Sequence, residues 1–145
     1  MRQLGFTLIE LVLVVALIGI LAVASFPLFT GSFLTNARSG SMRATAGAVQ
    51  SGIALYAATQ AAAGNGTSYP STLDSAATNS TASDANPLFG TVLQNGVTDQ
   101  WFKVSGTCYV YDTNGNKTKD ANPTDTYYSY NSTTGTFAVA TGGCT

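Results

Sequence analysis

The sequence contains no histidine, a single glutamate and very little charge of either sign. Lys, Arg, Asp and Glu make up 9% of the 145 residues and the formal net charge is −1, whereas roughly 25% is usual for a soluble domain. Without histidine the chain lacks the most common general acid–base residue, and no Ser or Cys lies in a recognisable nucleophile motif. Its few basic residues form no patch of the size that duplex DNA requires. We therefore expect no catalytic residue, no cofactor and no nucleic-acid partner.

Cysteine is scarce as well, with Cys108 and Cys144 as the only two. Neither has a second Cys beside it, and there is no His in the chain, so the usual zinc sites are excluded. A disulfide between the two is predicted, which would require an oxidising compartment and would stabilise the fold by roughly 3–4 kcal/mol. Two buried free thiols are the alternative.

The apolar residues are concentrated near the N-terminus. From Phe6 to Ala24 every residue except Thr7, Glu10 and Gly19 is Leu, Ile, Val, Ala or Phe. As a helix, at about 1.5 Å per residue, this run spans about 29 Å, which is enough to cross a bilayer core. Two general interpretations are a secretory signal peptide cut after Ala24, at an A-x-A site, and a transmembrane anchor that is never cut.

Glu10 argues against both interpretations. A carboxylate in an apolar helix costs about 2.5–3.5 kcal/mol at the bilayer centre and is rare there without a partner. The segment Gly5-Phe6-Thr7-Leu8-Ile9-Glu10-Leu11 resembles, without a gap, the prepilin processing motif of type IV pilins and type II secretion pseudopilins. The resemblance is close over residues 5–30 and only architectural beyond them.

This resemblance implies a defined processing chemistry. A membrane-embedded prepilin peptidase would cut between Gly5 and Phe6 on the cytoplasmic side and then N-methylate Phe6. Glu10 would pair with the positively charged N-terminus, at Phe6, of a neighbouring subunit, since either charge alone in an apolar filament core is heavily penalised. The implied partners are other copies of the chain, the peptidase and an assembly platform.

The predicted fold is α+β, with a long N-terminal helix packed against a small antiparallel sheet, as in pilins. We expect a leader at residues 1–5, a transmembrane and assembly helix at 6–30, and an amphipathic half of the same helix at 31–63. A connecting loop at 64–98, with at most a short helical turn near its end, would lead to a sheet at 99–145 that includes the disulfide-bounded C-terminal region.

Two features are expected to shape the long helix. Pro27 predicts a kink, and by resemblance the segment from Gly19 to Pro27 becomes extended in a filament. Gly64-Asn65-Gly66 predicts the helix end. Arg38 and Gln50 are expected to lie on faces of the helix turned away from the head. One face repeats at spacings of four and three and is predicted to lie on a globular head: Met42, Ala46, Val49, Ile53, Tyr56 and Gln60.

Four segments rich in aromatic residues, Val and Thr predict a meander of three or four antiparallel strands, at residues 100–104, 107–112, 126–131 and 136–140. A loop between the second and third of them places several side-chain oxygens together, somewhat like a calcium loop: Asp112, Asn114, Asn116 and Asp120. The match is poor, because Gly115 does not follow the third ligand and no bidentate Glu follows. An Asn-Gly hairpin turn with solvated side chains is the alternative.

Three functions are left open by the sequence. The first is a structural subunit of a type IV pilus, held in the inner membrane and then assembled outside the cell for adhesion, motility or DNA uptake. The second is a minor pilin or a pseudopilin of a periplasmic type II secretion pseudopilus. The third, of another class, is a soluble secreted binding module released by cleavage after Ala24.

Overall fold

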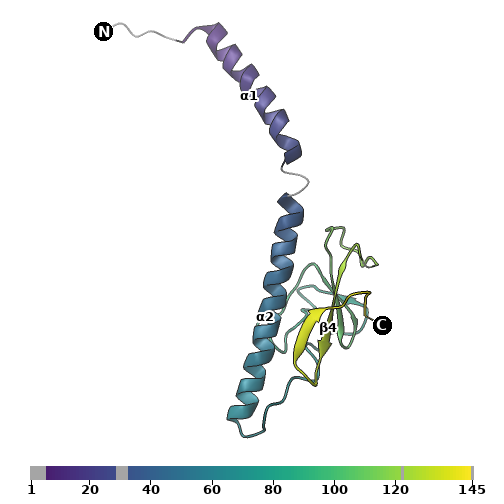
Figure 1. Ribbon diagram of the computed structural model, residues 1–145. Helices are drawn as coiled ribbons and strands as arrows, with labels where there is room; N and C mark the ends of the chain where they lie inside the picture. The colour runs from purple at the N-terminus through teal and green to yellow at the C-terminus, as the bar shows by residue number, and fades with distance from the viewer. Residues whose placement is uncertain (1–5, 29–32, 122, 145) are drawn as a thin grey trace, which may run out of the picture. The chain divides into compact units, whose positions relative to one another are not determined.

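The computed structural model describes residues 6–28, 33–121 and 123–144. Two helices, α1 (Leu8–Leu28) and α2 (Leu34–Ala62), precede five strands that form one antiparallel sheet (Figure 1). The α+β fold class predicted from the sequence is confirmed, and the combination of an apolar helix, a second helix and this sheet is consistent with the pilin fold. The chain divides into two compact units, Met1–Ala37 and Arg38–Thr145, and each is considered by itself.

The long helix predicted by the sequence is present as two helices, and residues 29–32 between them lie outside the described part of the chain. Pro27 does not interrupt α1, which continues to Leu28. The predicted kink at Pro27 and the predicted extension of residues 19–27 in a filament both stay predictions.

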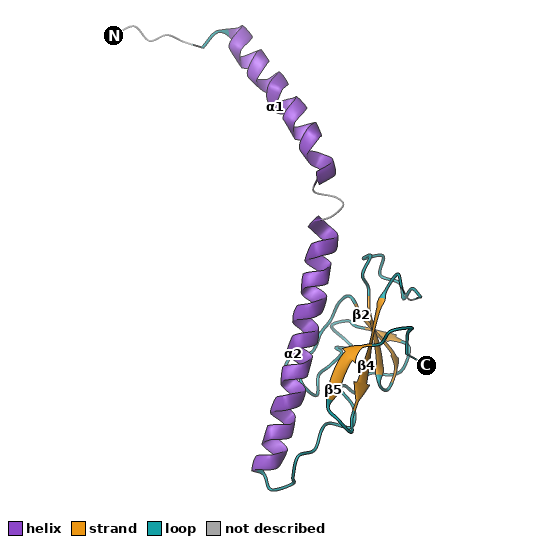
Figure 2. Cartoon of the chain, viewed as in Figure 1, coloured by secondary structure: helices purple, strands orange, loops and turns teal. Residues whose placement is uncertain are grey.

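The sheet is a meander in which each strand pairs with the next in chain order (Figure 2). Four of its strands lie within one residue of the predicted segments at every end: β2 (Trp101–Ser105), β3 (Cys108–Tyr111), β4 (Thr126–Asn131) and β5 (Thr136–Val139). The fifth, β1 (Ser80–Thr81), lies inside the predicted loop and pairs with β2. A two-residue strand is too short for sequence periodicity to reveal.

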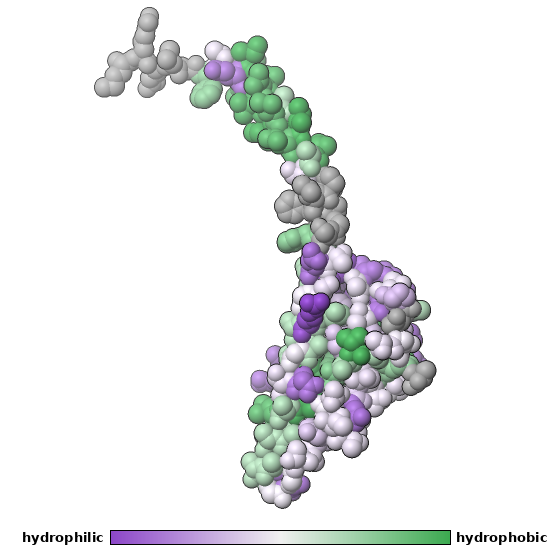
Figure 3. Space-filling model, in the orientation of Figure 1, coloured by the Kyte–Doolittle hydropathy of each residue, from purple (hydrophilic) through white to green (hydrophobic). Residues whose placement is uncertain are grey.

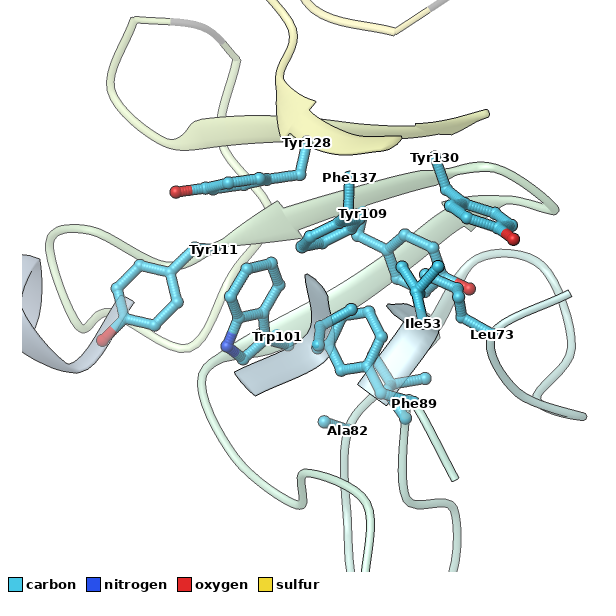
Figure 4. Close-up of a cluster of buried hydrophobic side chains, with 12 residues drawn as sticks. Ile53, Leu73, Ala82, Phe89, Trp101, Tyr109, Tyr111, Tyr128, Tyr130 and Phe137 are labelled. Carbon is cyan, nitrogen blue, oxygen red and sulfur yellow. The ribbon is translucent and has the colours of Figure 1, made fainter. Parts of the chain in front are cut away.

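The core lies on the face of the sheet that α2 covers, and aromatic rings dominate it (Figure 4). Phe89 is at its centre, with its ring centroid 5.2 Å from that of Trp101 and 4.6 Å from that of Tyr109. Leu73, Leu88 and Phe89 are fully buried although they belong to the segment predicted as a connecting loop. That segment is therefore part of the core, because its few apolar residues are buried by tertiary contacts that a mostly polar local composition does not indicate.

The predicted amphipathic face of α2 is confirmed by the burial of its side chains. Val49, Ile53 and Ala57 are buried, and Met42 and Ala46 pack against the same core. Gly52 lies on this side too, where a Cβ atom would overlap the backbone carbonyl of Val92. The glycine thus lets the loop backbone approach α2 closely.

Arg38 and Gln50, expected to lie away from the head, both contact it. The guanidinium of Arg38 donates a hydrogen bond to the carbonyl of Asn114. The amide of Gln50 donates to the carbonyl of Gly135 at 2.9 Å and accepts from the N–H of Phe137 at 2.8 Å. The hydrophobic periodicity could not show this, because Gln50 reaches the edge strand β5 and Arg38 reaches the β3–β4 loop through long polar side chains.

Helix α2 ends at Ala62, just before the predicted stop signal. The Asn65 N–H donates to the Gln60 carbonyl at 3.1 Å and the Gly64 N–H to the Ala61 carbonyl at 3.1 Å, which is the hydrogen-bond pattern of a Schellman cap. Gly64 has a φ of 80°, a left-handed conformation that a side chain would strain. The glycine therefore ends the helix through its backbone geometry.

Candidate functional site

A hydrogen-bonded cap starts helix α1. One carboxylate oxygen of Glu10, Oε2, accepts from the Thr7 N–H at 3.0 Å and from the Thr7 hydroxyl at 2.9 Å, while the Thr7 Oγ1 accepts from the Glu10 N–H at 3.4 Å. This is a capping box, in which a Thr and a Glu three residues later satisfy backbone N–H groups that a helix start leaves unpaired. The charge of Glu10 alone does not indicate this second role, whereas its Thr-x-x-Glu spacing does.

The acidic group is set in an otherwise apolar surface. Phe6, Leu11, Val14 and Val15 line a shallow hollow of about 280 Å³ together with Glu10. The carboxylate is the one charged group among the described residues of α1, Leu8–Leu28. Of its two oxygens, only Oε2 accepts a hydrogen bond from the described chain, so Oε1 is available to a partner.

The remainder of α1 presents apolar side chains in every direction. The window Leu8–Ser25 is long and apolar enough to cross a membrane, and none of it is buried by the described part of the chain. Figure 3 shows these side chains as a continuous hydrophobic surface. Such a surface is stable only when lipid or other helices cover it.

The other residues of this segment that were predicted to have a role lie at its start, in the middle of α1 and at the end of α1. Gly5 lies outside the described residues, and Phe6 immediately precedes Thr7 and the capped helix. Gly19 lies within α1, where a Cβ atom would have open space around it. Pro27 is part of the same helix by its backbone, and its side chain lies outside the described residues.

Cys108 and Cys144 are joined by a disulfide, with their Cα atoms 5.7 Å apart. The bond fixes the C-terminal tail to β3, one of the central strands of the sheet. A link across 36 positions of sequence separation restricts the unfolded chain and so stabilises the folded head.

The four candidate calcium ligands lie in one loop and bind one another or the backbone. Asp112 is buried and accepts from the N–H groups of Gly115 and Lys117. The Asp120 Oδ2 accepts from the side-chain amides of Asn114 at 2.7 Å and Asn116 at 2.8 Å. Within the described residues no three side chains of His, Cys, Asp or Glu are grouped so that they could hold a metal ion. In this arrangement the carboxylates shape the loop.

A further carboxylate of the same loop was not singled out by the sequence. Asp125 accepts from the Thr113 N–H at 3.1 Å and from the Asp120 N–H at 2.7 Å. Burial, with the nearby charges of Asp112 and Asp120 adding to it, raises the pKa of Asp125 above its ordinary value, against the effect of the two N–H donors. The loop is therefore held by two buried carboxylates, one at each end.

A buried ionic cluster inside the head was also missed. Lys103 and Asp74 form an ion pair at 2.6 Å with side chains only 5% and 1% exposed. Asp74 also accepts from the Tyr109 hydroxyl at 2.9 Å and the Phe89 N–H at 3.2 Å, and burial together with this carboxylate raises the pKa of Tyr109 far above its usual range. The cluster anchors the 64–98 segment to β2 and β3.

Comparison with known proteins supports the N-terminal part of this description. The family model of the prokaryotic N-terminal methylation motif matches residues 1–26. This is the prepilin-type signature shared by type IV pilins and pseudopilins. No curated protein and no solved structure shows significant similarity to the chain, so the head is characterised by its own geometry.

Proposed function

We propose that this chain, which carries the prepilin-type signature, is a structural subunit of a type IV pilus. The observation that carries the proposal is α1 itself. A helix with the signature at its start, one carboxylate in its first turn and a window, Leu8–Ser25, that the described chain leaves unburied is suited to lie first in a bilayer and then among identical helices.

The proposed processing follows from the order of the segments. Residues 1–5 are the leader, and a prepilin peptidase of the inner membrane removes it between Gly5 and Phe6 and methylates Phe6. Residues 6–30 are the membrane and assembly helix, 31–63 the amphipathic half, 64–98 the connecting segment and 99–145 the sheet with its disulfide-bounded region. The disulfide of Cys108 and Cys144 suits the oxidising side of the membrane, where the head would fold.

Glu10 is proposed to direct assembly through the carboxylate oxygen that its own helix leaves free. In the described chain Oε2 is occupied by Thr7. Oε1 is then available to the amino group of Phe6 on a neighbouring copy, at the lip of the apolar hollow that Phe6 and Glu10 share. An unpaired carboxylate among packed apolar helices would be strongly unfavourable, so a subunit gains most when it inserts beside an unpaired N-terminus.

A conformational change on assembly is part of the proposal. Gly19 and Pro27 are the poorest helix formers of α1, at roughly 1 and 3 kcal/mol less favourable than alanine in a helix interior. The helix between them is therefore the segment expected to become extended when subunits pack. Helical density through residues 19–27 in a filament map would reject this part of the proposal.

The first experiment is the intact mass and N-terminal sequence of the mature protein, purified from the membrane and sheared-surface fractions of the native bacterium. A chain that begins at N-methylated Phe6 is expected, and a strain without prepilin peptidase should retain residues 1–5. A soluble chain that begins at Ser25 would instead identify a secreted module and overturn the filament proposal.

A second measurement separates the pilus from the pseudopilus. Subunits of a pilus are expected as filaments in the sheared-surface fraction, where the assembled protein should sediment and be seen by electron microscopy. Recovery only from the periplasmic side, with loss of protein secretion on deletion, would assign the chain to a type II secretion pseudopilus.

A further inference from the structure

The sheet has a groove on the face turned away from α2. Thr81 of β1 and Phe102 of β2 are register partners, and their side chains share the face opposite Trp101, which lies in the core. Two hollows of about 440 and 310 Å³ have Thr81, Phe102 and Lys117 in common. We call these two adjoining hollows the β1–β2 groove. Each part falls in the size range of small-molecule sites, about 300–1,000 Å³.

The groove has opposite charges at its two ends. Its larger part is lined by Asp84, Asp99 and the buried Asp112, its smaller part by Lys119 and the buried Lys103 without a carboxylate, and Lys117 lines both parts. Asp84, Asp99, Lys117 and Lys119 are exposed, and none of them belongs to the ion pair found among the described residues, which joins Lys103 to Asp74. These four groups can therefore meet a ligand, Asp99 through the oxygen that does not accept from the Gln100 N–H.

Backbone strain is concentrated at the same place. Among the described residues four other than glycine have positive φ, and three of them line the groove: Asn79 at 57°, Gln100 at 62° and Lys117 at 61°. Each such residue costs about 1–3 kcal/mol, and strain of this kind tends to gather where a protein shapes a binding site.

The lining indicates the chemistry of the ligand. Its uncharged lining includes the hydroxyl groups of Thr81, Ser83 and Thr98 together with Ala82, Gln100 and the Phe102 ring. Carboxylates only accept hydrogen bonds, which suits a sugar's hydroxyl groups, and ammonium groups only donate, which suits a carboxylate. A hydroxyl-lined hollow without deep apolar pockets offers little to peptide side chains, and the carboxylates would repel a nucleic-acid backbone.

We propose that the β1–β2 groove binds a short oligosaccharide with one acidic sugar at its end. The acidic sugar lies between Lys117 and Lys119, and the neutral sugars extend over Thr81 and Phe102 toward Asp84 and Asp99. The site lies on the sheet face opposite α2 and uses no residue of α1. It therefore does not depend on the proposed role in a filament.

The test uses the full chain in micelles of a polyoxyethylene detergent, which has no sugar headgroup to compete. Sialyllactose is the probe and lactose, its neutral core, is the matched ligand control. Binding is measured by isothermal titration calorimetry and by saturation-transfer NMR at low salt. Sialyllactose is expected to bind and lactose to bind at least about threefold more weakly, because the exposed carboxylate–lysine pair is lost.

Two variants locate the site. Lys119→Gln is expected to weaken sialyllactose binding about threefold and leave lactose binding unchanged, while Asp84→Asn weakens both sugars. Arg43→Gln is the charge-matched control, because Arg43 is an exposed residue of α2 that does not line the groove. Absence of binding by the wild type, or equal losses in Lys119→Gln and Arg43→Gln, would overturn the proposal.

Discussion

Gln50 and Phe137 are 87 positions apart in the sequence, yet the Gln50 side-chain oxygen accepts a hydrogen bond from the Phe137 N–H at 2.8 Å. The same amide donates to the Gly135 carbonyl at 2.9 Å. Gly135 and Phe137 alternate with Thr136, so both backbone groups point away from β4. Gln50 thus fills the place that a neighbouring strand would take at the outer edge of β5.

Replacement of Gln50 by alanine is predicted to destabilise the head by about 1–3 kcal/mol, since it leaves a buried N–H and a carbonyl without a partner. The measurement is denaturant unfolding of the full chain in micelles, followed by tryptophan fluorescence. Gln94→Ala is the matched control, because Gln94 is exposed in a loop, and its effect is expected to stay within about 0.5 kcal/mol. Equal effects of the two variants would contradict the role assigned to Gln50.

Two glycines of α2 are predicted to respond oppositely to the same substitution. Gly52→Ala forces a Cβ atom against the Val92 carbonyl and should destabilise the head by about 1–3 kcal/mol. Gly47→Ala meets no atom within 4 Å and should stabilise the helix by about 0.5–1 kcal/mol. The same unfolding assay distinguishes them, and a neutral Gly52→Ala would show that the 64–98 segment packs loosely on α2.

Loss of Asp74 is predicted to destabilise the head more than loss of Lys103. Asp74→Asn leaves the Lys103 ammonium buried without an opposite charge, although the Ala76 carbonyl still accepts from it, and should cost about 3–5 kcal/mol. Lys103→Met should cost less, because Asp74 keeps N–H and hydroxyl donors from Ala76, Phe89 and Tyr109. Urea midpoints of both variants provide the comparison. The reverse order would mean that Lys103 is hydrated in the folded head.

The two roles of Glu10 are predicted to separate by mutation. Glu10→Gln keeps the capping box, where Gln is also accepted, but removes the charge, so the start of α1 should persist while surface filaments fall by about tenfold or more. Thr7→Ala should speed amide exchange at the first turn about fivefold, for a lost cap of about 1 kcal/mol, and spare most assembly. Exchange in micelles and quantitation of sheared filaments are the measurements. Equal assembly defects would show that the cap itself is what assembly requires.

The sequence indicated the elements that have a strong local pattern. The apolar run before Ser25, the α2 face through Val49 and Ile53, and four of the strands could be predicted, because burial on one face leaves a periodic trace. Leu73 and Phe89 could not, since Leu73 stands alone among polar neighbours and the short apolar stretch around Phe89 has no periodicity that identifies a buried element. The pairing of Lys103 with Asp74 was also hidden, because 29 positions separate them and only the sheet brings them together.

The sequence indicated what kind of site lies at the start of α1, but it indicated only part of the geometry of that site. The seven residues from Gly5 to Leu11 sufficed to indicate prepilin processing. The Thr7–Glu10 bonds were not predicted, although the three-residue spacing of the two side chains fits a capping box. The β1–β2 groove could not be predicted from the sequence, because only strand register and loop conformation bring Thr81, Phe102 and Lys117 together.

Both edges of the sheet limit strand pairing between copies of the head. β1 is two residues long, and at β5 the amide of Gln50 occupies two of the outward-pointing backbone groups. Neither edge offers the long row of free N–H and carbonyl groups on which amyloid-like stacking begins. Copies of the head held close together would therefore not pair edge to edge through their sheets.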